Sequence, residues 1–367
     1  MLEKIKTALL TYQDPYLGVS LAEANVFKSI ELKKQNTATV SLVLGFPSDV
    51  YKAQLIQALS DFLEETLQLS SFSWSVDWEV LSVIQPHALR AGIKRLKTIK
   101  NVIAVASGKG GVGKSTVAVN LALALKKEGA SVGLLDADIY GPSQACMLGV
   151  EAPAMSQDGK HFEPTLAHGL YTNSMAYLIA KEETPMIWRG PMVGRALEQL
   201  FFDTNWPALD YLIIDLPPGT GDVSLTLVQK IPLTGVVMVT TPQKVAVLDV
   251  KKALTMFAKV NIPILGIVEN MAAHACPSCG HLSDVFGEKG GEILAEQYKT
   301  PFLGRLELAK KMCESSEAGI PWMAQELPEY MTNKNTQVFY EIAGKASAQL
   351  ALMKVDYSGK LPGVVVE

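Results

Sequence analysis

The chain has 367 residues, of which 48% are hydrophobic and 19% charged, and its net charge is −4 at neutral pH. This composition is typical of a globular protein long enough for two domains, and it lacks the basic excess of nucleic-acid-binding proteins. No apolar run reaches the roughly 18 residues of a membrane-spanning helix, no export signal is visible, and four cysteines do not make a secreted disulfide framework. We therefore expect a cytoplasmic protein that binds neither nucleic acid nor membrane.

Residues 1–85 indicate a small α+β domain, because helical and alternating apolar patterns follow one another. The expected elements are a helix over 1–11, strands over 26–32 and 37–46, a helix over 49–67 and a strand over 71–80. The following segment, 86–100, is rich in lysine and arginine, has no acidic residue and is predicted to be a linker.

The next segment, 101–355, changes to apolar strands separated by helical stretches. Strands are expected over 102–107, 131–138, 210–218, 235–242 and 263–271. Near-continuous apolar strands that alternate with helices predict an α/β fold with a mostly parallel sheet covered by helices on both faces. Ligands of such sheets bind at the carboxyl ends of the strands. Residues 356–367 form a tail.

A phosphate-binding loop follows the first of these strands. The stretch "VIAVASGKGGVGKSTVAVN" (residues 102–120) contains G-x-x-x-x-G-K-[ST] between a strand and a helix, the pattern of P-loop nucleotide sites. Lys114 is expected to reach the β- and γ-phosphates, Ser115 to bind Mg²⁺, and Thr116 to lie near the α-phosphate. The expected ATP-binding residues are Gly108, Lys109, Gly110, Gly111, Val112, Gly113, Lys114, Ser115 and Thr116.

Two further strands end in carboxylates at the same predicted sheet edge. Asp215 ends "DYLIID", where a Mg²⁺-bound water needs a carboxylate, and the glycines of the next loop, Gly219 and Gly221, could sense the γ-phosphate. Asp136 and Asp138 end "VGLLDAD". A single strand-end aspartate is often a cap or turn residue, but these face Lys114 and Asp215. We expect Asp136 to support the metal and Asp138 to position the attacking water.

The loop "KGGVGKST" carries a lysine, Lys109, beyond the one that the P-loop pattern requires. It resembles the deviant P-loop of ATPases related to septum-positioning and plasmid-partition proteins. In that group the first lysine crosses a dimer interface to the partner's phosphates. The resemblance therefore implies a nucleotide-sandwich homodimer in which Lys109 is catalytic together with Lys114 and Asp138.

The Cys-Pro-Ser-Cys-Gly segment predicts a metal-binding knuckle, in which Cys276 and Cys279 point two thiolates at one site. Zinc and iron–sulfur clusters usually take four ligands, so a homodimer could supply the second pair. The remaining cysteines, Cys146 and Cys313, are interpreted as buried small residues. A redox dithiol and a structural zinc, with the nearby His274 or His281 as an optional ligand, are the alternatives.

The full set of motifs resembles the Mrp/ApbC family of ATP-binding iron–sulfur cluster carriers over about 100–325. These motifs are KGGVGKST, DADIYGPS, DYLIIDLPPGTGD, TTPQ, ENM, CPSCG and FGEKGG. The resemblance implies that Cys276 and Cys279 hold a [4Fe–4S] cluster that bridges two subunits, received from a donor scaffold and delivered to apoproteins. It also implies that the amide of Asn270 recognises adenine.

Two segments depart from the family pattern. The N-terminal domain resembles the small domain of bacterial Mrp proteins and iron–sulfur assembly factors, but "LGFPSDV" lacks the cysteine that relatives often carry there. Relatives also commonly have Asp-Pro and an arginine where this chain has Leu308, Ala309 and Met312. That change is expected to alter either the contacts of the nucleotide or the dimer surface.

Two other functions compete with that of a cluster carrier. A positioning ATPase that assembles on membrane or DNA would need a basic amphipathic tail or patch, which "ALMKVDYSGKLPGVVVE" does not offer. A protein-targeting ATPase could be a dimer clasped by zinc through the same cysteines. The identity of the bound metal separates that alternative from the cluster carrier.

Overall fold

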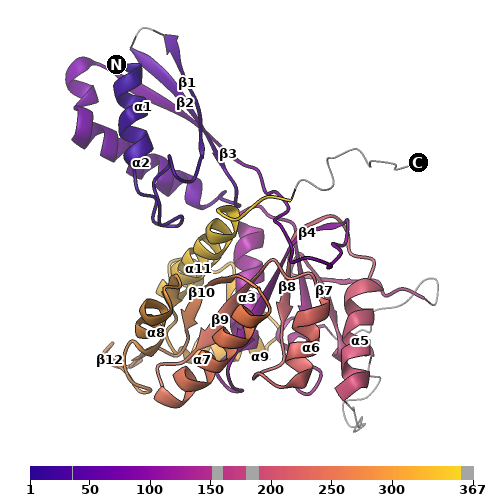
Figure 1. Cartoon of the computed structure of the whole chain (residues 1–367). Coiled ribbons are helices and arrows are strands. Elements are labelled where there is room, and N and C mark those ends of the chain that lie inside the picture. The colour runs from indigo at the N-terminus through magenta and orange to yellow at the C-terminus, as the bar shows by residue number, and fades with distance from the viewer. Residues whose placement is uncertain (35, 151–159, 179–189, 357–367) are drawn as a thin grey trace, which may run out of the picture.

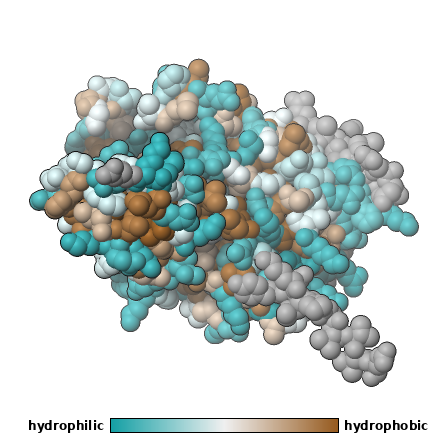
Figure 2. Space-filling view, turned by 90° about the horizontal axis from the view of Figure 1, so that it is seen from above, coloured by the Kyte–Doolittle hydropathy of each residue, from teal (hydrophilic) through white to brown (hydrophobic). Residues whose placement is uncertain are grey.

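The computed structural model describes residues 1–34, 36–150, 160–178 and 190–356. A small N-terminal domain stands on a larger α/β domain, and the helix nearest the C-terminus reaches the junction between them (Figure 1). The surface seen from above is mostly hydrophilic, with apolar side chains in small separate patches (Figure 2). Among the helices of the described ranges, none combines the length and apolarity that crossing a membrane requires.

The N-terminal domain is a three-stranded sheet with helices against one face. Its elements are α1 (Leu2–Thr11), β1 (Phe27–Lys34), β2 (Thr37–Leu44), α2 (Tyr51–Leu67) and β3 (Ser75–Ser82). Strand β2 is central, antiparallel to β1 and parallel to β3, and every second residue of β2 is buried in the domain core. The five predicted elements are confirmed, but β3 starts at Ser75 because a 3₁₀ turn (Leu69–Phe72) occupies the start of the predicted range.

The large domain is built on an eight-stranded sheet of order β13-β10-β9-β4-β8-β5-β7-β6. Every neighbouring pair is parallel except β6 and β7. The five predicted strands are present, whereas the short strands β6, β7 and β13 were missed. Strand β4 begins two residues inside the predicted linker. The strands are β4 (Ile99–Ser107), β5 (Val132–Asp136), β6 (Thr165–Ala167), β7 (Leu170–Ser174), β8 (Leu209–Asp215), β9 (Gly235–Thr240), β10 (Ile264–Glu269) and β13 (Phe302–Arg305).

Helices cover both faces of this sheet, as the apolar strands predict. One buried layer joins the sheet to α3 (Lys114–Lys127) and α11 (Lys334–Ala351). The opposite layer joins it to α5 (Gly190–Phe202), α6 (Asp222–Lys230), α7 (Lys244–Lys259) and α8 (Gly290–Tyr298). Shorter helices are α4 (Gln144–Met147), α9 (Lys310–Glu317) and α10 (Pro328–Met331), with 3₁₀ turns at Met175–Leu178 and Trp322–Ala324.

Helix α11 ties the two domains together. Ala348, near its end, is part of the N-terminal core, and Gln349 Nε2 donates to the carbonyl of Leu17 at 2.9 Å. Gly344 is required by packing, because a Cβ there would lie 2.2 Å from the ring of Tyr16. The N-terminal domain is thus fixed against the α/β domain by interdigitated side chains.

The predicted linker also has fixed partners. The backbone N–H of Asp356 donates to the carbonyl of Pro86, and that of Ala88 donates to the carbonyl of Lys354, both at 2.8 Å. The guanidinium of Arg95 lies 3.3 Å from the carboxylate of Asp356. Of the predicted tail only Asp356 is described, and 357–367 lie outside the described residues.

The C-terminal end of α3 forms a second contact between the domains. The buried carboxylate of Glu128 accepts hydrogen bonds from the backbone N–H groups of Val50 (2.8 Å) and Tyr51 (3.2 Å) at the start of α2. The carbonyl of Glu128 accepts one from the backbone N–H of Asp49 at 3.1 Å. One helix therefore begins at the phosphate loop and ends against the N-terminal domain.

Replacing Glu128 with alanine is expected to lower the free energy of unfolding by about 1–3 kcal/mol, because the backbone N–H groups of Val50 and Tyr51 at the start of α2 lose their acceptor. Urea unfolding followed by circular dichroism measures this change. Glu65→Ala, on the exposed face of the same α2, is the matched control. If the Glu128→Ala protein is as stable as the control, the contact of Glu128 with the start of α2 does not stabilise the fold.

The same carboxylate predicts a pH dependence of stability. Burial raises the pKa of Glu128 above its usual 4.5, against the opposing effect of the hydrogen bonds from Tyr51 and Val50. Between pH 4.5 and the raised pKa, the folded protein therefore keeps a proton that the unfolded chain has lost. The stability contributed by Glu128 is expected to fall as pH rises from 4.5 through the raised pKa, and Glu128→Gln should remove that part of the dependence.

Candidate nucleotide and metal sites

The phosphate loop joins β4 to α3 at the carboxyl edge of the sheet. Gly111 and Gly113 have φ values of +77° and +78°, the left-handed region that favours glycine, and Gly113 caps the helix. Gly108 is required by packing, because a Cβ there would lie 2.3 Å from the carbonyl carbon of Asp249 on α7. The loop is therefore held between the sheet edge and α7, with backbone N–H groups and the N-terminus of α3 available to an anion.

Lys114 lies in the first turn of α3 and points into a group of buried acids. Its ammonium pairs with the carboxylate of Asp215 and lies 3.6 Å from Oδ2 of Asp138 and 3.3 Å from Oγ of Ser115. Strands β5 and β8 end in register, so that Asp136 stands opposite Asp215. Lys114 and the three carboxylates are each at most 9% exposed. The structure thus brings these five predicted residues to one point of the sheet edge.

The acids outnumber the cation at this point. Burial, with the neighbouring carboxylate of Asp215, raises the pKa of Asp136 to about 7. Burial also raises the pKa of Asp138, against the opposing charge of Lys114. Carboxylate and hydroxyl oxygens are the ligands that Mg²⁺ prefers, so Asp136, Asp215 and Ser115 fit a magnesium ion shared with a bound phosphate.

Asn270 follows β10 and braces the phosphate loop. Its Nδ2 donates to the carbonyl of Val112 at 2.9 Å, and its Oδ1 accepts from the backbone N–H of Met271 at 2.9 Å. The side chain is buried and leaves no room for a Cβ at Gly113, where it would lie 2.2 Å from Nδ2. Both ends of the predicted adenine-binding amide therefore already contact the protein, and Asn270 holds the loop in shape.

Replacing Asn270 with alanine is expected to weaken nucleotide binding about 10-fold, because the carbonyl of Val112 loses its buried donor and the loop loses its brace. Titration with a fluorescent ADP analogue measures the change. Asn270→Asp keeps the bond to Met271 but not the donor to Val112, so it should behave like alanine. Wild-type affinity in both variants would contradict the bracing role.

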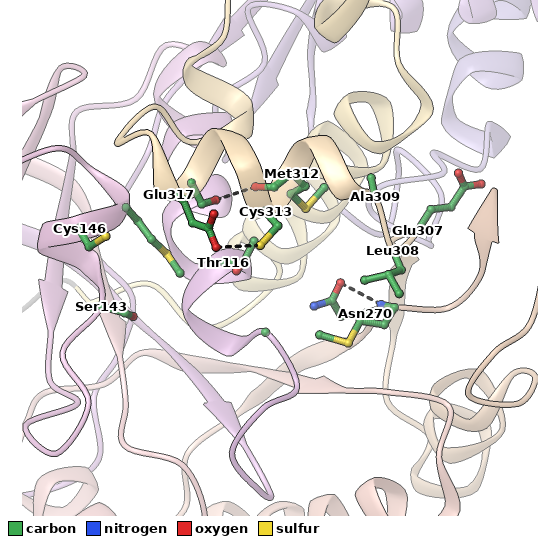
Figure 3. A pocket seen from close by; sticks show the side chains of 14 residues that line it. Thr116, Ser143, Cys146, Asn270, Glu307, Leu308, Ala309, Met312, Cys313 and Glu317 are labelled. Carbon is green, nitrogen blue, oxygen red and sulfur yellow. Dashed lines mark hydrogen bonds between the residues drawn. The ribbon is translucent and has the colours of Figure 1, made fainter. Parts of the chain in front are cut away.

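A pocket of about 340 Å³ opens beside the loop (Figure 3). The N-terminus of α3, the short helix α4, the residues just after β10 and one side of α9 form its walls, which are largely apolar. The departures from the family pattern, Leu308, Ala309 and Met312, line this pocket. They therefore lie in the pocket wall on the same side as Asn270.

Cys146 and Cys313 do not lie in the core. Both are exposed, and both line the pocket, from α4 and α9 (Figure 3). The prediction that they are buried small residues was wrong because these short helices stand at the rim of the pocket. The thiol of Cys313 donates to a carboxylate oxygen of Glu317 at 3.4 Å, and that hydrogen bond raises its pKa.

The second lysine of the loop takes a different position from Lys114. The ammonium of Lys109 is directed away from the acids and donates to Oε1 of Gln243, at the start of α7, at 3.2 Å. Gly219, in the loop after β8, has a φ of +86° and donates its N–H to the carbonyl of Ser107 at 3.0 Å. The loop expected to sense the γ-phosphate is thus attached to the strand end before the phosphate loop.

The cysteine pair forms an exposed knuckle between two short strands, β11 (His274–Ala275) and β12 (Leu282–Ser283). The backbone N–H of Cys276 donates to the carbonyl of His281 at 2.9 Å, and that of Gly280 donates to the carbonyl of Cys276 at 2.8 Å. Backbone N–H groups of Ser278 and Cys279 lower the pKa of the Cys276 thiol. Such a thiol forms the thiolate, and so ligates metal, more readily.

The histidines near the knuckle are not placed as ligands. The Nδ1 atom of His274 lies 3.1 Å from the carbonyl of Leu308. Within the described ranges no group of three or more His, Cys, Asp and Glu side chains is arranged to hold a metal ion. Among the described residues, the knuckle therefore offers the thiols of Cys276 and Cys279 without a third such side chain placed beside them.

Sequence reasoning missed one residue of the nucleotide site. Gln144 is 1% exposed, and its Nε2 donates to Oδ2 of Asp215 at 2.9 Å and to the carbonyl of Ser115 at 3.0 Å. Its backbone N–H donates to Oδ2 of Asp136 at 3.1 Å. No sequence pattern marks it, because its position depends on how the chain returns to the sheet edge after β5.

This fold and this site define a P-loop nucleoside triphosphatase. Residues 98–346 match the family model described as NUBPL iron-transfer P-loop NTPase, and residues 2–69 match the model described as iron-sulfur cluster assembly protein. The chain therefore belongs to the iron-transfer P-loop NTPase family, with an N-terminal domain of the iron–sulfur assembly type.

Named relatives match between 62% and 95% of this chain. The protein named iron-sulfur cluster carrier protein of Haemophilus influenzae is 44% identical over 348 residues, covering 95% of this chain and 91% of its own. One of the same name from Methanocaldococcus jannaschii is 50% identical over 230 residues, covering 62% and 79%. A nucleotide-binding protein from Archaeoglobus fulgidus, solved with ADP, has a TM-score of 0.55 and 37% identity, covering 65% of this chain and 93% of that one.

Proposed function

We propose that the protein carries an iron–sulfur cluster on Cys276 and Cys279 and delivers it to apoproteins, with ATP bound and hydrolysed by a homodimer. The observation that carries this proposal is the exposed knuckle, whose Cys276 thiol has a lowered pKa, in a chain of the iron-transfer family. Two cysteine side chains at the surface suit a cargo that must be received from a donor scaffold and released again.

Ligand number supports the homodimer. A [4Fe–4S] cluster takes four cysteine thiolates, and one chain offers two on its knuckle, so a second copy across a twofold axis would complete the set. Exposed apolar side chains lie on α7, on α8 and beside the knuckle, and would be covered in such a dimer. They are Val245 (64% exposed), Leu248 (58%), Leu282 (51%), Val285 (59%) and Ile293 (49%).

The nucleotide site supports ATP hydrolysis at the same interface. Lys114 would neutralise charge on the β- and γ-phosphates, and Ser115, Asp136 and Asp215 would hold Mg²⁺, which supplies charge stabilisation to the phosphates. Asp138, whose Oδ2 lies 3.6 Å from the ammonium of Lys114, would position the attacking water. Lys109, on the α7 side of the loop, would reach the nucleotide of the other subunit.

Cluster transfer to an apoprotein tests the proposal. The holo-protein is incubated under anaerobic conditions with an apo-dehydratase that requires a [4Fe–4S] cluster, and recovery of dehydratase activity is followed over time. Recovery is expected with the wild type and with Cys146→Ala/Cys313→Ala, whose thiols lie at the pocket and not on the knuckle. Recovery by Cys276→Ala/Cys279→Ala at the wild-type rate would refute the proposal.

A further inference from the structure

Gln144 connects every protein group that the proposed magnesium site would use. Its side-chain amide bonds Asp215 and the carbonyl of Ser115, and its backbone N–H bonds Asp136. The carboxylate of Asp136 also accepts from Oγ of Ser174 at 3.2 Å. These bonds engage Oδ2 of Asp136 and Oδ2 of Asp215, and they therefore fix the orientation of both carboxylate groups.

One atom of Gln144, Oε1, has no partner among the residues that the structure describes. It is buried, and the buried hydroxyl of the preceding residue, Ser143, likewise has no partner in the described ranges. Buried polar atoms are nearly always paired, so two adjacent exceptions beside a nucleotide site indicate groups that a ligand completes. An amide oxygen is only an acceptor and can pair with a water bound to a cation, which is a strong donor.

We infer that Gln144 is a positioning residue of the magnesium site: its Nε2 fixes Asp215 and the loop at Ser115, and its Oε1 accepts a hydrogen bond from a water on the metal. The inference rests on the proposed function, since it assumes that the nucleotide binds with Mg²⁺. Partners outside the first ligand shell commonly change metal affinity about 10- to 100-fold when they are removed.

The test separates metal binding from nucleotide binding. Binding of a fluorescent ADP analogue is titrated with Mg²⁺ for the wild type, Gln144→Met and Gln144→Asn, and repeated in EDTA. Methionine keeps the volume but no polar atom, and asparagine keeps the amide but is too short to reach both partners. Each variant should need about 10-fold more Mg²⁺ for half of the Mg²⁺-dependent gain in affinity, with affinity in EDTA within about threefold of wild type.

Other outcomes are decisive as well. Equal losses with and without Mg²⁺ in both variants would assign Gln144 a packing role, and wild-type Mg²⁺ requirements in both would remove it from the site. Either result overturns the inference while leaving the proposed function in place. A wild type that binds the analogue without any effect of Mg²⁺ would overturn the inference together with the proposed role of Mg²⁺. If Gln144→Met does not fold, Gln144→Asn carries the test.

Discussion

Replacing Lys114 with alanine is expected to reduce ATP hydrolysis by at least about 100-fold, because the transition state loses a preorganised positive charge at the transferred phosphate. The replacement also leaves the fully buried carboxylate of Asp215 without its cation, beside the second carboxylate of Asp136. An unpaired buried charge costs about 3–5 kcal/mol, so the free energy of unfolding should fall as well.

Two measurements separate these effects. Phosphate release from ATP gives the hydrolysis rate, and urea unfolding gives the stability. Lys114→Arg keeps a charge for Asp215, so it should recover much of the stability without recovering hydrolysis. Lys126→Ala, at the other end of α3, is the control and should match the wild type in rate. Hydrolysis by Lys114→Ala within about threefold of wild type would exclude Lys114 from the site that we describe.

Replacing Lys109 with alanine should give a different result from replacing Lys114 with alanine. Its ammonium bonds Gln243 rather than the buried acids, so the fold and the affinity for nucleotide should remain within about threefold of wild type. Hydrolysis should nevertheless fall by about 100-fold or more, because we propose that Lys109 of the second subunit adds a positive charge that stabilises the transition state. Fluorescent-nucleotide titration and phosphate release measure the two quantities.

Mixing the two inactive variants tests whether Lys109 acts across the interface. In a mixed dimer, the Lys109→Ala subunit keeps Lys114 and would receive an intact Lys109 from the Lys114→Ala subunit. In an equimolar mixture, about half of the dimers would be mixed, and each mixed dimer would have one complete site out of two. About a quarter of all sites would then be complete, so the mixture should recover about a quarter of wild-type activity. Activity no greater than the sum of the separate variants would show that Lys109 does not act in trans.

The parts of the fold and site that could be predicted from the sequence are those that lie at the carboxyl ends of the parallel strands. Because parallel strands end at one edge, the order of strands and motifs along the chain is enough to place the aspartates after β5 and β8 beside Lys114. The strands of the large sheet that were missed, β6, β7 and β13, are only three, five and four residues long, too short for a periodic pattern to stand out.

The remaining features depend on tertiary contacts that no local pattern encodes. Gln144 reaches Asp215 only because the segment after β5 folds back over the sheet edge. Cys146 and Cys313 look like ordinary small residues until α4 and α9 place them at one pocket. The contact of Glu128 with the start of α2 joins residues 78 positions apart along the chain, between two separately predicted domains.

Metal analysis of the reconstituted protein shows whether two copies of the knuckle hold one cluster, as we propose. The wild type and Cys276→Ala/Cys279→Ala are reconstituted anaerobically with iron and sulfide, and iron, sulfide, zinc and molecular mass are measured. We predict about four irons and four sulfides per wild-type dimer, and none in the variant. A folded wild-type dimer that holds zinc and takes up no sulfide would contradict the claim and make the knuckle a structural clasp.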